Sequence, residues 1–261
     1  MARHTRWLIA LTLLCVAAAF VVPAIPQWPS YHQFADRRGA FGIPNFLDVA
    51  SNAGFLIAGL EGLIVLFGGR AQFEFARERW PWTVFFFGML LAGIGSAYYH
   101  LAPDNERLFY DRLPMTFAFM GLVASQIVDR IGVRAGLASL VPLLVAGAAS
   151  VVFWRWTERA GVGNVVPYGI LQGYAIVLLL SLAIMVPSRY SRGGDLYWIF
   201  GWYFVAKLLE AFDGSVFALG HLASGHSLKH LAAAGSGFVA CHMLMHRTLR
   251  PRTAAAFESA R

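Results

Sequence analysis

The sequence is poor in charged residues, which make up only 13% of its 261 positions, against about 25% in ordinary soluble domains. Hydrophobic residues make up 58%, and the mean hydropathy is +0.58. Several apolar runs approach the ~20 residues that are needed to cross a bilayer. We therefore expect an integral, multi-pass membrane protein.

Cysteine is nearly absent as well. Cys15 and Cys241 both lie inside apolar runs, near opposite ends of the chain, which argues against a disulfide or a thiolate metal site. The chain also lacks a soluble domain and a long linker. Its net charge of +7 comes from basic residues scattered between apolar runs, so we expect no nucleic-acid partner and interpret them as residues that flank membrane helices.

Eight hydrophobic segments divide the chain. They cover residues 7–25, 46–68, 82–101, 111–129, 137–154, 165–186, 196–219 and 226–246. We expect an all-α fold in which residues 29–246 form a seven-helix transmembrane core. An additional N-terminal transmembrane helix lies in residues 1–28, where a basic start and small residues at 17–19 are also compatible with a signal peptide or an uncleaved signal-anchor. Residues 247–261 are expected to form a cytoplasmic basic tail.

The distribution of basic residues predicts the orientation of these segments. With the N-terminus in the cytoplasm, thirteen arginines fall on the inner side and seven basic residues on the outer side, while Lys207 lies inside a segment. Basic residues concentrate on the cytoplasmic side of membrane proteins. We therefore expect both termini to be cytoplasmic.

The last segment begins with two histidines four residues apart, His226 and His230. On a helix they share one face and lie about 6 Å apart, which suits two ligands of one metal ion. The zinc-protease motif has a glutamate directly after the first histidine. Here Ser227 stands in that place, so a general base must come from another segment. Taken alone, such a pair is as compatible with helix packing as with metal binding.

Two other segments place polar residues on the same predicted outer side. The third segment ends with Ser96 and His100, which are one helical turn apart, and the fourth begins with Asp111. Pro114 is expected in the first turn of that helix, where proline is tolerated. His246 lies 16 residues beyond His230, roughly 24 Å away along a helix, so it is excluded from this group.

Together these residues predict a catalytic zinc site that opens toward the extracytoplasmic leaflet. His100, His226 and His230 would supply three neutral imidazoles and leave a fourth position to water, whose pKa falls to about 7 on zinc. Asp111 could hold and deprotonate that water. The Ser96 hydroxyl could donate to an oxyanion that forms on a carbonyl beside the metal.

The motifs resemble those of the alkaline ceramidase family, which belongs to the CREST superfamily of membrane hydrolases together with the adiponectin receptors. The likeness consists of Gly-Ser-x-x-x-His, an aspartate eleven residues later, and His-x-x-x-His at the start of the last span. A stretch at residues 45–52 resembles the first core helix of the family, and the similarity spans roughly residues 31–246. The matching residues are Ser96, His100, Asp111, His226 and His230.

The resemblance implies a seven-helix core with zinc held by the three histidines. It further implies that Asp111 holds the zinc water and that Ser96 assists cleavage of the N-acyl bond of a sphingolipid such as ceramide, which yields a fatty acid and a sphingoid base. Eukaryotic members also bind calcium through an acidic stretch. Because Asn45 stands where they have a glutamate, the calcium site is not carried over.

Three charged residues of the seventh segment suggest alternatives. Lys207 and Glu210 are expected to pair, because an ionised group inside a bilayer costs about 2.5–3.5 kcal/mol. Asp213 could accept a proton from a zinc-ligating histidine, and Glu61 is another candidate partner of Lys207.

Lys207, Glu210 and Asp213 could instead form the ion relay of a transporter, although the paired broken helices of such proteins are missing. A receptor-like or signalling protein that keeps the zinc fold without turnover is the main alternative to a hydrolase.

Overall fold

The computed structural model describes residues 3–251, and within them it is all-helical and without strands. Each of the eight predicted segments contains a helix, and the second and seventh segments are each divided in two. The α-helices are α1 (Arg3–Val21), α2 (Phe46–Ala50), α3 (Ala53–Phe67), α4 (Arg79–Leu101), α5 (Asn105–Arg130), α6 (Val133–Arg159), α7 (Val166–Met185), α8 (Asp195–Ala211), α9 (Asp213–Ala218) and α10 (Gly225–His246), and two 3-10 helices are η1 (Pro29–His32) and η2 (Ala76–Glu78).

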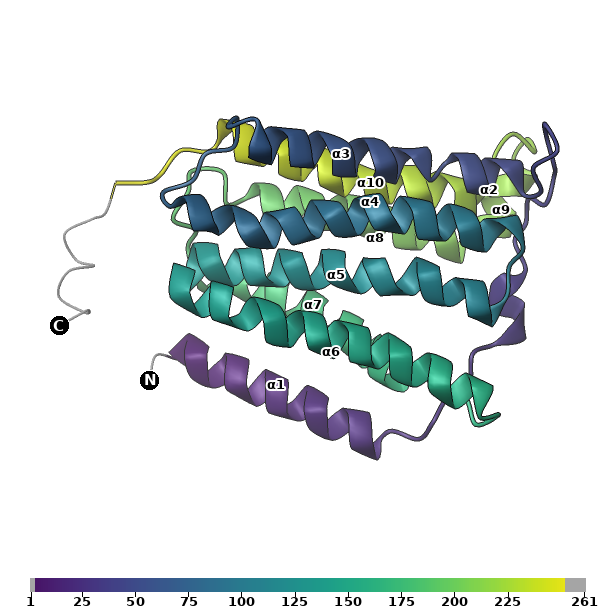
Figure 1. Ribbon diagram of the computed structural model, residues 1–261, viewed down its shortest axis with the longest axis horizontal. Helices are drawn as coiled ribbons and strands as arrows, with labels where there is room; N and C mark the ends of the chain where they lie inside the picture. Colours follow the sequence, from purple (N-terminus) through teal and green to yellow (C-terminus); the bar gives the residue numbers. More distant parts are fainter. Residues whose placement is uncertain (1–2, 252–261) are drawn as a thin grey trace.

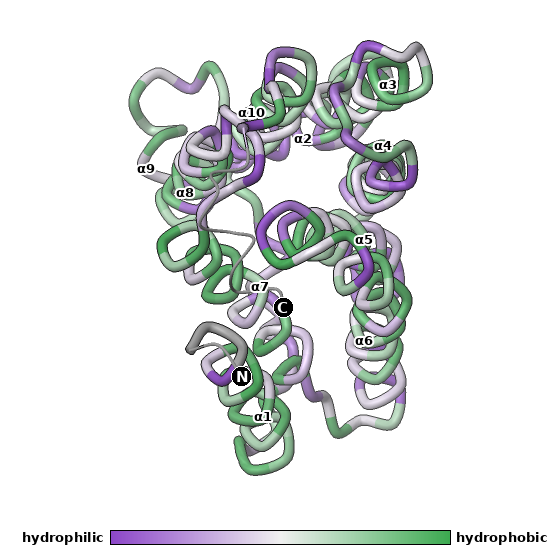
Figure 2. The backbone as a smooth tube through the Cα atoms, turned by 90° about the vertical axis from the view of Figure 1, so that its left-hand side faces the viewer, coloured by the Kyte–Doolittle hydropathy of each residue, from purple (hydrophilic) through white to green (hydrophobic). Residues whose placement is uncertain are grey.

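The long helices run roughly along one direction and form a bundle (Figure 1). Helix α4 packs against α3 and α5, and α5 packs in turn against α6. Helix α10 lies between α3 and α8, whereas α1 contacts α7 at the edge of the bundle (Figure 2). Helices α4, α5 and α10, which carry the predicted site residues, are therefore brought into one part of the bundle.

Four helical stretches are long and apolar enough to cross a membrane. These are Phe46–Phe67, Ala76–Leu101, Val133–Arg159 and Val166–Met185. Large apolar side chains are exposed on the outside of the bundle, for example Phe20 (86% exposed) and Ile184 (74%), which suits contact with lipid. These features indicate a membrane protein.

The seven-helix core with an additional N-terminal span stays a prediction. Helix α8 has only 17 residues, and α5 and α10 carry a larger share of polar and charged residues than the four stretches named above. Helices with polar and charged side chains can cross a membrane only if those side chains face protein rather than lipid. Length and composition alone therefore do not identify them as spans.

The ends of the described chain lie at one end of the bundle, and the start of α10 lies at the other (Figure 1). Which end faces the cytoplasm stays a prediction. At the start of the expected basic tail, Arg247 is buried, donates from Nε to the carbonyl of Gln72 at 2.8 Å and lies over the ring of Tyr190. Residues 248–251 of that tail are also described, and residues 252–261 lie outside the described residues.

Helix α5 begins earlier than the hydrophobic pattern predicts. Asp104 caps it by accepting from the backbone N–H of Arg107 at 2.7 Å, and the first helical residue is Asn105. Pro114 therefore lies well inside the helix and not in its first turn. Since proline has no N–H, the carbonyl of Tyr110 four residues earlier loses its helical partner. This carbonyl lies against Gly95 of α4, the residue directly before Ser96 of the candidate site.

Candidate metal centre

Three histidines form a buried group between α4 and α10. His100, His226 and His230 are only 1%, 6% and 4% exposed, and each offers a ring nitrogen within 4.8 Å of the others. The Nε2 atoms of His100 and His226 are 3.3 Å apart. Two nitrogens bound at about 2.0–2.1 Å to a tetrahedral zinc ion lie about 3.3 Å apart, so the spacing fits. This group could hold a metal ion, as the sequence predicts.

The start of α10 is held in place by side chains that cap its backbone. Ser224 accepts from the backbone N–H of Ser227 at 3.0 Å. Asp213 accepts from the backbone N–H of His226 at 2.7 Å and from that of Ala35 at 2.9 Å. The sequence suggested that Asp213 accepts a proton from the ring of a metal-binding histidine. Instead, both of its carboxylate oxygens accept hydrogen bonds from backbone N–H groups. Its role is to position His226.

Two contacts that sequence reasoning missed lie next to the histidines. The hydroxyl of Ser51 and Nδ1 of His230 are 2.8 Å apart, and this bond leaves Nε2 of His230 for a metal. The carboxylate of Asp48 is buried and accepts from the hydroxyl of Ser227 at 2.6 Å. Both residues belong to the stretch 45–52, whose family-like pattern was the signal that could have found them. A partner such as Ser51 orients a ligating histidine and tunes its affinity for the metal.

The histidine group is closed on one side by an aromatic side chain. Phe34, in the segment between η1 and α2, places its ring centroid 4.7 Å from that of His100 and 4.3 Å from that of His226. Among the described residues, Nδ1 of His100 is buried without a hydrogen-bond partner. The ring of Phe34 thus covers His100 and His226 with apolar surface.

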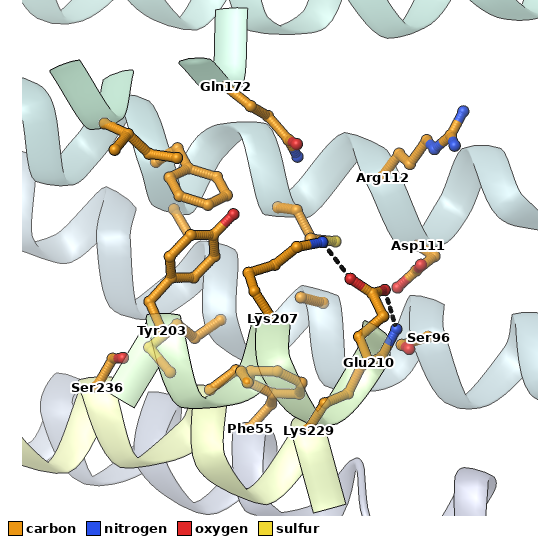
Figure 3. Close-up of a pocket in the computed structure, with 18 of the residues that line it drawn as sticks. Phe55, Ser96, Asp111, Arg112, Gln172, Tyr203, Lys207, Glu210, Lys229 and Ser236 are labelled. Atoms are coloured by element: carbon orange, nitrogen blue, oxygen red, sulfur yellow. Dashed lines mark hydrogen bonds and ion pairs between the residues drawn. The ribbon is translucent and has the colours of Figure 1, made fainter. Parts of the chain in front are cut away.

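Ser96 and Asp111 meet beside the histidines. Ser96 lies one turn before His100 on α4, and Asp111 belongs to the neighbouring helix α5. Figure 3 shows the two side chains next to each other. Both residues and His230 line one cavity. The structure thus brings together all five residues that the sequence singled out.

That cavity has a volume of about 380 Å³ and extends from Ser96 and Asp111 toward the middle of the bundle. Farther along α4 and α5 its walls become apolar. The apolar lining includes Phe85, Met89, Phe119, Leu122, Leu179 and Ile199. A cavity with a polar end and an apolar arm suits an amphipathic molecule with a polar group and a long hydrocarbon chain.

The polar part of the cavity also holds a three-residue charge cluster. Lys207 and Glu210 form the predicted ion pair, and the other carboxylate oxygen of Glu210 accepts from Lys229 at 2.6 Å (Figure 3). Among the described residues, no ion pair joins Lys207 to Glu61. Lys229 was missed because it was counted as a flanking charge on the outer side. Its place inside the His-Ser-Leu-Lys-His motif was the available signal.

Comparison with protein families and with curated proteins finds no match for this chain. The resemblance to the alkaline ceramidases therefore depends on the short motifs alone and stays a prediction.

Proposed function

We propose that this protein is a zinc-dependent membrane hydrolase that cleaves the N-acyl amide bond of a lipid such as ceramide, giving a fatty acid and a sphingoid base. The observation that carries the proposal is the combination of three elements in one place. A three-histidine group, the neighbouring side chains of Ser96 and Asp111, and an apolar arm of the cavity lie next to one another.

The donor set favours zinc among the common metals. Three neutral imidazoles with no carboxylate or thiolate among them are typical of catalytic zinc, which keeps a fourth position for water or substrate. When bound, zinc acts as a Lewis acid that polarises an amide carbonyl and makes water more acidic. His100, His226 and His230 would hold it.

The neighbouring side chains have roles that follow from their chemistry. Asp111 is the general base, which takes a proton from the attacking water and delivers it to the nitrogen of the leaving amine. Ser96 donates either to Asp111 or to the carbonyl oxygen, where negative charge develops in the transition state. Because the site is buried, these hydrogen bonds act in surroundings of low dielectric constant and are stronger than in water.

The rest of the cavity is proposed to bind the acyl chain. The amide would lie between Ser96 and His230, and the hydrocarbon would extend along α4 and α5 past Met89 and Leu122. Burial of each methylene contributes about 0.8 kcal/mol, so the apolar arm supplies binding energy at a distance from the reacting bond.

The proposal is tested by metal analysis together with mass spectrometry of lipid products. Protein purified in mild detergent should contain one zinc ion per chain and release fatty acid from an N-acyl lipid. Asp111→Ala should keep its zinc and lose roughly 10²–10⁴-fold in rate. Absence of stoichiometric zinc would overturn the proposal. A zinc-loaded wild-type protein that releases no fatty acid from any N-acyl lipid would instead favour a receptor-like protein.

A further inference from the structure

The candidate site contains more cationic than anionic side chains. The cavity is lined by Arg112, Lys207 and Lys229, but only two acids, Asp111 and Glu210, line it with them. One positive charge is therefore in excess, before a metal ion adds its own. Arg112 is buried and the side chain of Lys229 is only 17% exposed, whereas that of Lys207 is 55% exposed. The excess charge therefore belongs to an accessible side chain that lines the cavity, and an anionic ligand can pair with it.

The two lysines have hydrogen-bond donors that the protein leaves unused. An ammonium group has three N–H donors. Lys207 and Lys229 each donate to one oxygen of Glu210, and neither ammonium makes another hydrogen bond within the described residues. A single carboxylate thus balances one of the two charges. The remaining donors lie on a wall of the cavity (Figure 3).

Arg112 adds a charge that no carboxylate in the described residues pairs with directly. It is 5% exposed, donates from Nη2 to Oε1 of Gln27 at 2.6 Å, and leaves Nε and Nη1 without a partner. Its guanidinium is stacked against the rings of Tyr31, Trp154 and Tyr168. Aromatic faces stabilise a cation only partly, so this end of the cavity keeps a positive potential.

We propose that the lipid substrate carries an anionic head group, a carboxylate or a phosphate, beside its amide bond, and that Lys207 and Lys229 bind this group. The inference rests on the proposed function and specifies its substrate class. Lys229 directly precedes His230 and lies within one turn of His226, so an anion held there is next to the bond to be cleaved. A neutral head group could accept hydrogen bonds from the lysines but would not balance the excess positive charge.

Matched lipid pairs test the proposal on the full-length protein in mild detergent. N-palmitoylglycine and N-palmitoylethanolamine share the acyl chain and differ in a carboxylate versus a hydroxyl, and ceramide 1-phosphate and ceramide differ in a phosphate. The readout is kcat/KM for release of fatty acid. We expect the anionic member of at least one pair to be preferred by roughly 10–100-fold, as one or two charge-assisted hydrogen bonds provide. The pair that shows the preference identifies the anion.

Variants of Lys207 separate binding by charge from a structural effect. In Lys207→Gln the preference for the anionic lipid should fall at least about tenfold toward equality, and Lys207→Arg should restore most of it. Arg192→Gln, which breaks an ion pair near the start of α8, should leave the preference unchanged. Equal or faster cleavage of the neutral lipids would overturn the head-group inference while the hydrolase proposal stands. If no lipid of either pair is cleaved, the proposed function itself fails.

Discussion

The main-chain carbonyl of Tyr110 lies directly against Gly95, so closely that a Cβ atom at Gly95 would come within 1.9 Å of the carbonyl oxygen. Pro114 frees this carbonyl from the hydrogen bonding of α5, and glycine removes the side chain that would push α5 away from α4. The contact involves the neighbours in sequence of Ser96 and Asp111. It therefore determines whether the serine and the aspartate can meet.

Gly95→Ala tests this contact. The added methyl must displace backbone, which costs about 1–3 kcal/mol when a packed core is overfilled. We expect a lower midpoint of thermal unfolding and a loss of at least about tenfold in hydrolysis, because the placement of Ser96 beside Asp111 is disturbed. Gly173→Ala is the control, since Gly173 lies inside α7 with nothing within 4 Å of its Cβ position. An unchanged activity in Gly95→Ala would contradict the positional role of the contact.

Metal content should depend on three histidines only. His100→Ala, His226→Ala and His230→Ala should each lower the bound zinc below one ion per chain, because a three-ligand site does not tolerate the loss of a ligand. His242→Ala is the matched control. Its ring stacks on His246 at the opposite end of α10, and zinc should remain stoichiometric. Elemental analysis after gel filtration measures both. Zinc loss in His242→Ala, or its retention in His100→Ala, would place the metal elsewhere.

Ser51→Ala should weaken zinc binding without removing a ligand. The hydroxyl of Ser51 is the hydrogen-bond partner of Nδ1 of His230, and loss of such a partner typically lowers metal affinity 10–100-fold. Competition with a chelator measures the affinity. Ser139→Ala, which removes a hydroxyl that donates to the carbonyl of Gly136 in α6, should leave it unchanged. Equal affinities in the two variants would show that Ser51 does not orient His230.

Stability should depend on pH through Asp36, in the segment that covers the site. Hydrogen bonds from the Arg38 side chain at 2.8 and 2.7 Å hold the pKa of Asp36 below its ordinary value. A lowered pKa in the folded state stabilises the protein above the unfolded value, near 3.9, and this contribution disappears as the pH falls through the folded value. Asp36→Asn should therefore lower the melting temperature at pH 7.

The difference between Asp36→Asn and the wild-type protein should shrink when the pH is lowered below about 4. Arg38→Gln should show the same pH dependence, because it removes the other partner of the pair. Thermal melts followed by tryptophan fluorescence in detergent measure both. A difference that is as large at pH 3 as at pH 7 would show that the ion pair does not contribute.

Much of the candidate site follows from local patterns. The four-residue spacing of His226 and His230 places them on one face of a helix whatever the rest of the chain does, and Ser96 and His100 follow the same rule. The apolar runs predict helices because an apolar segment in lipid must satisfy its own backbone hydrogen bonds. The helix boundaries were less predictable. Helix α5 begins six residues before Asp111, because the cap at Asp104 extends it beyond the apolar run.

The sequence by itself determined an all-helical, membrane-type chain with polar residues at defined helix positions, because helix periodicity and hydropathy are local properties. The tertiary structure alone decided which of those residues meet. It brought Lys229 to Glu210, the hydroxyl of Ser51 to the ring of His230 and the carboxylate of Asp213 to the backbone of His226. The physical reason is that contacts between helices depend on their relative rotation and distance. Close approaches such as that of Gly95 to Tyr110 set both, and no single helix contains that information.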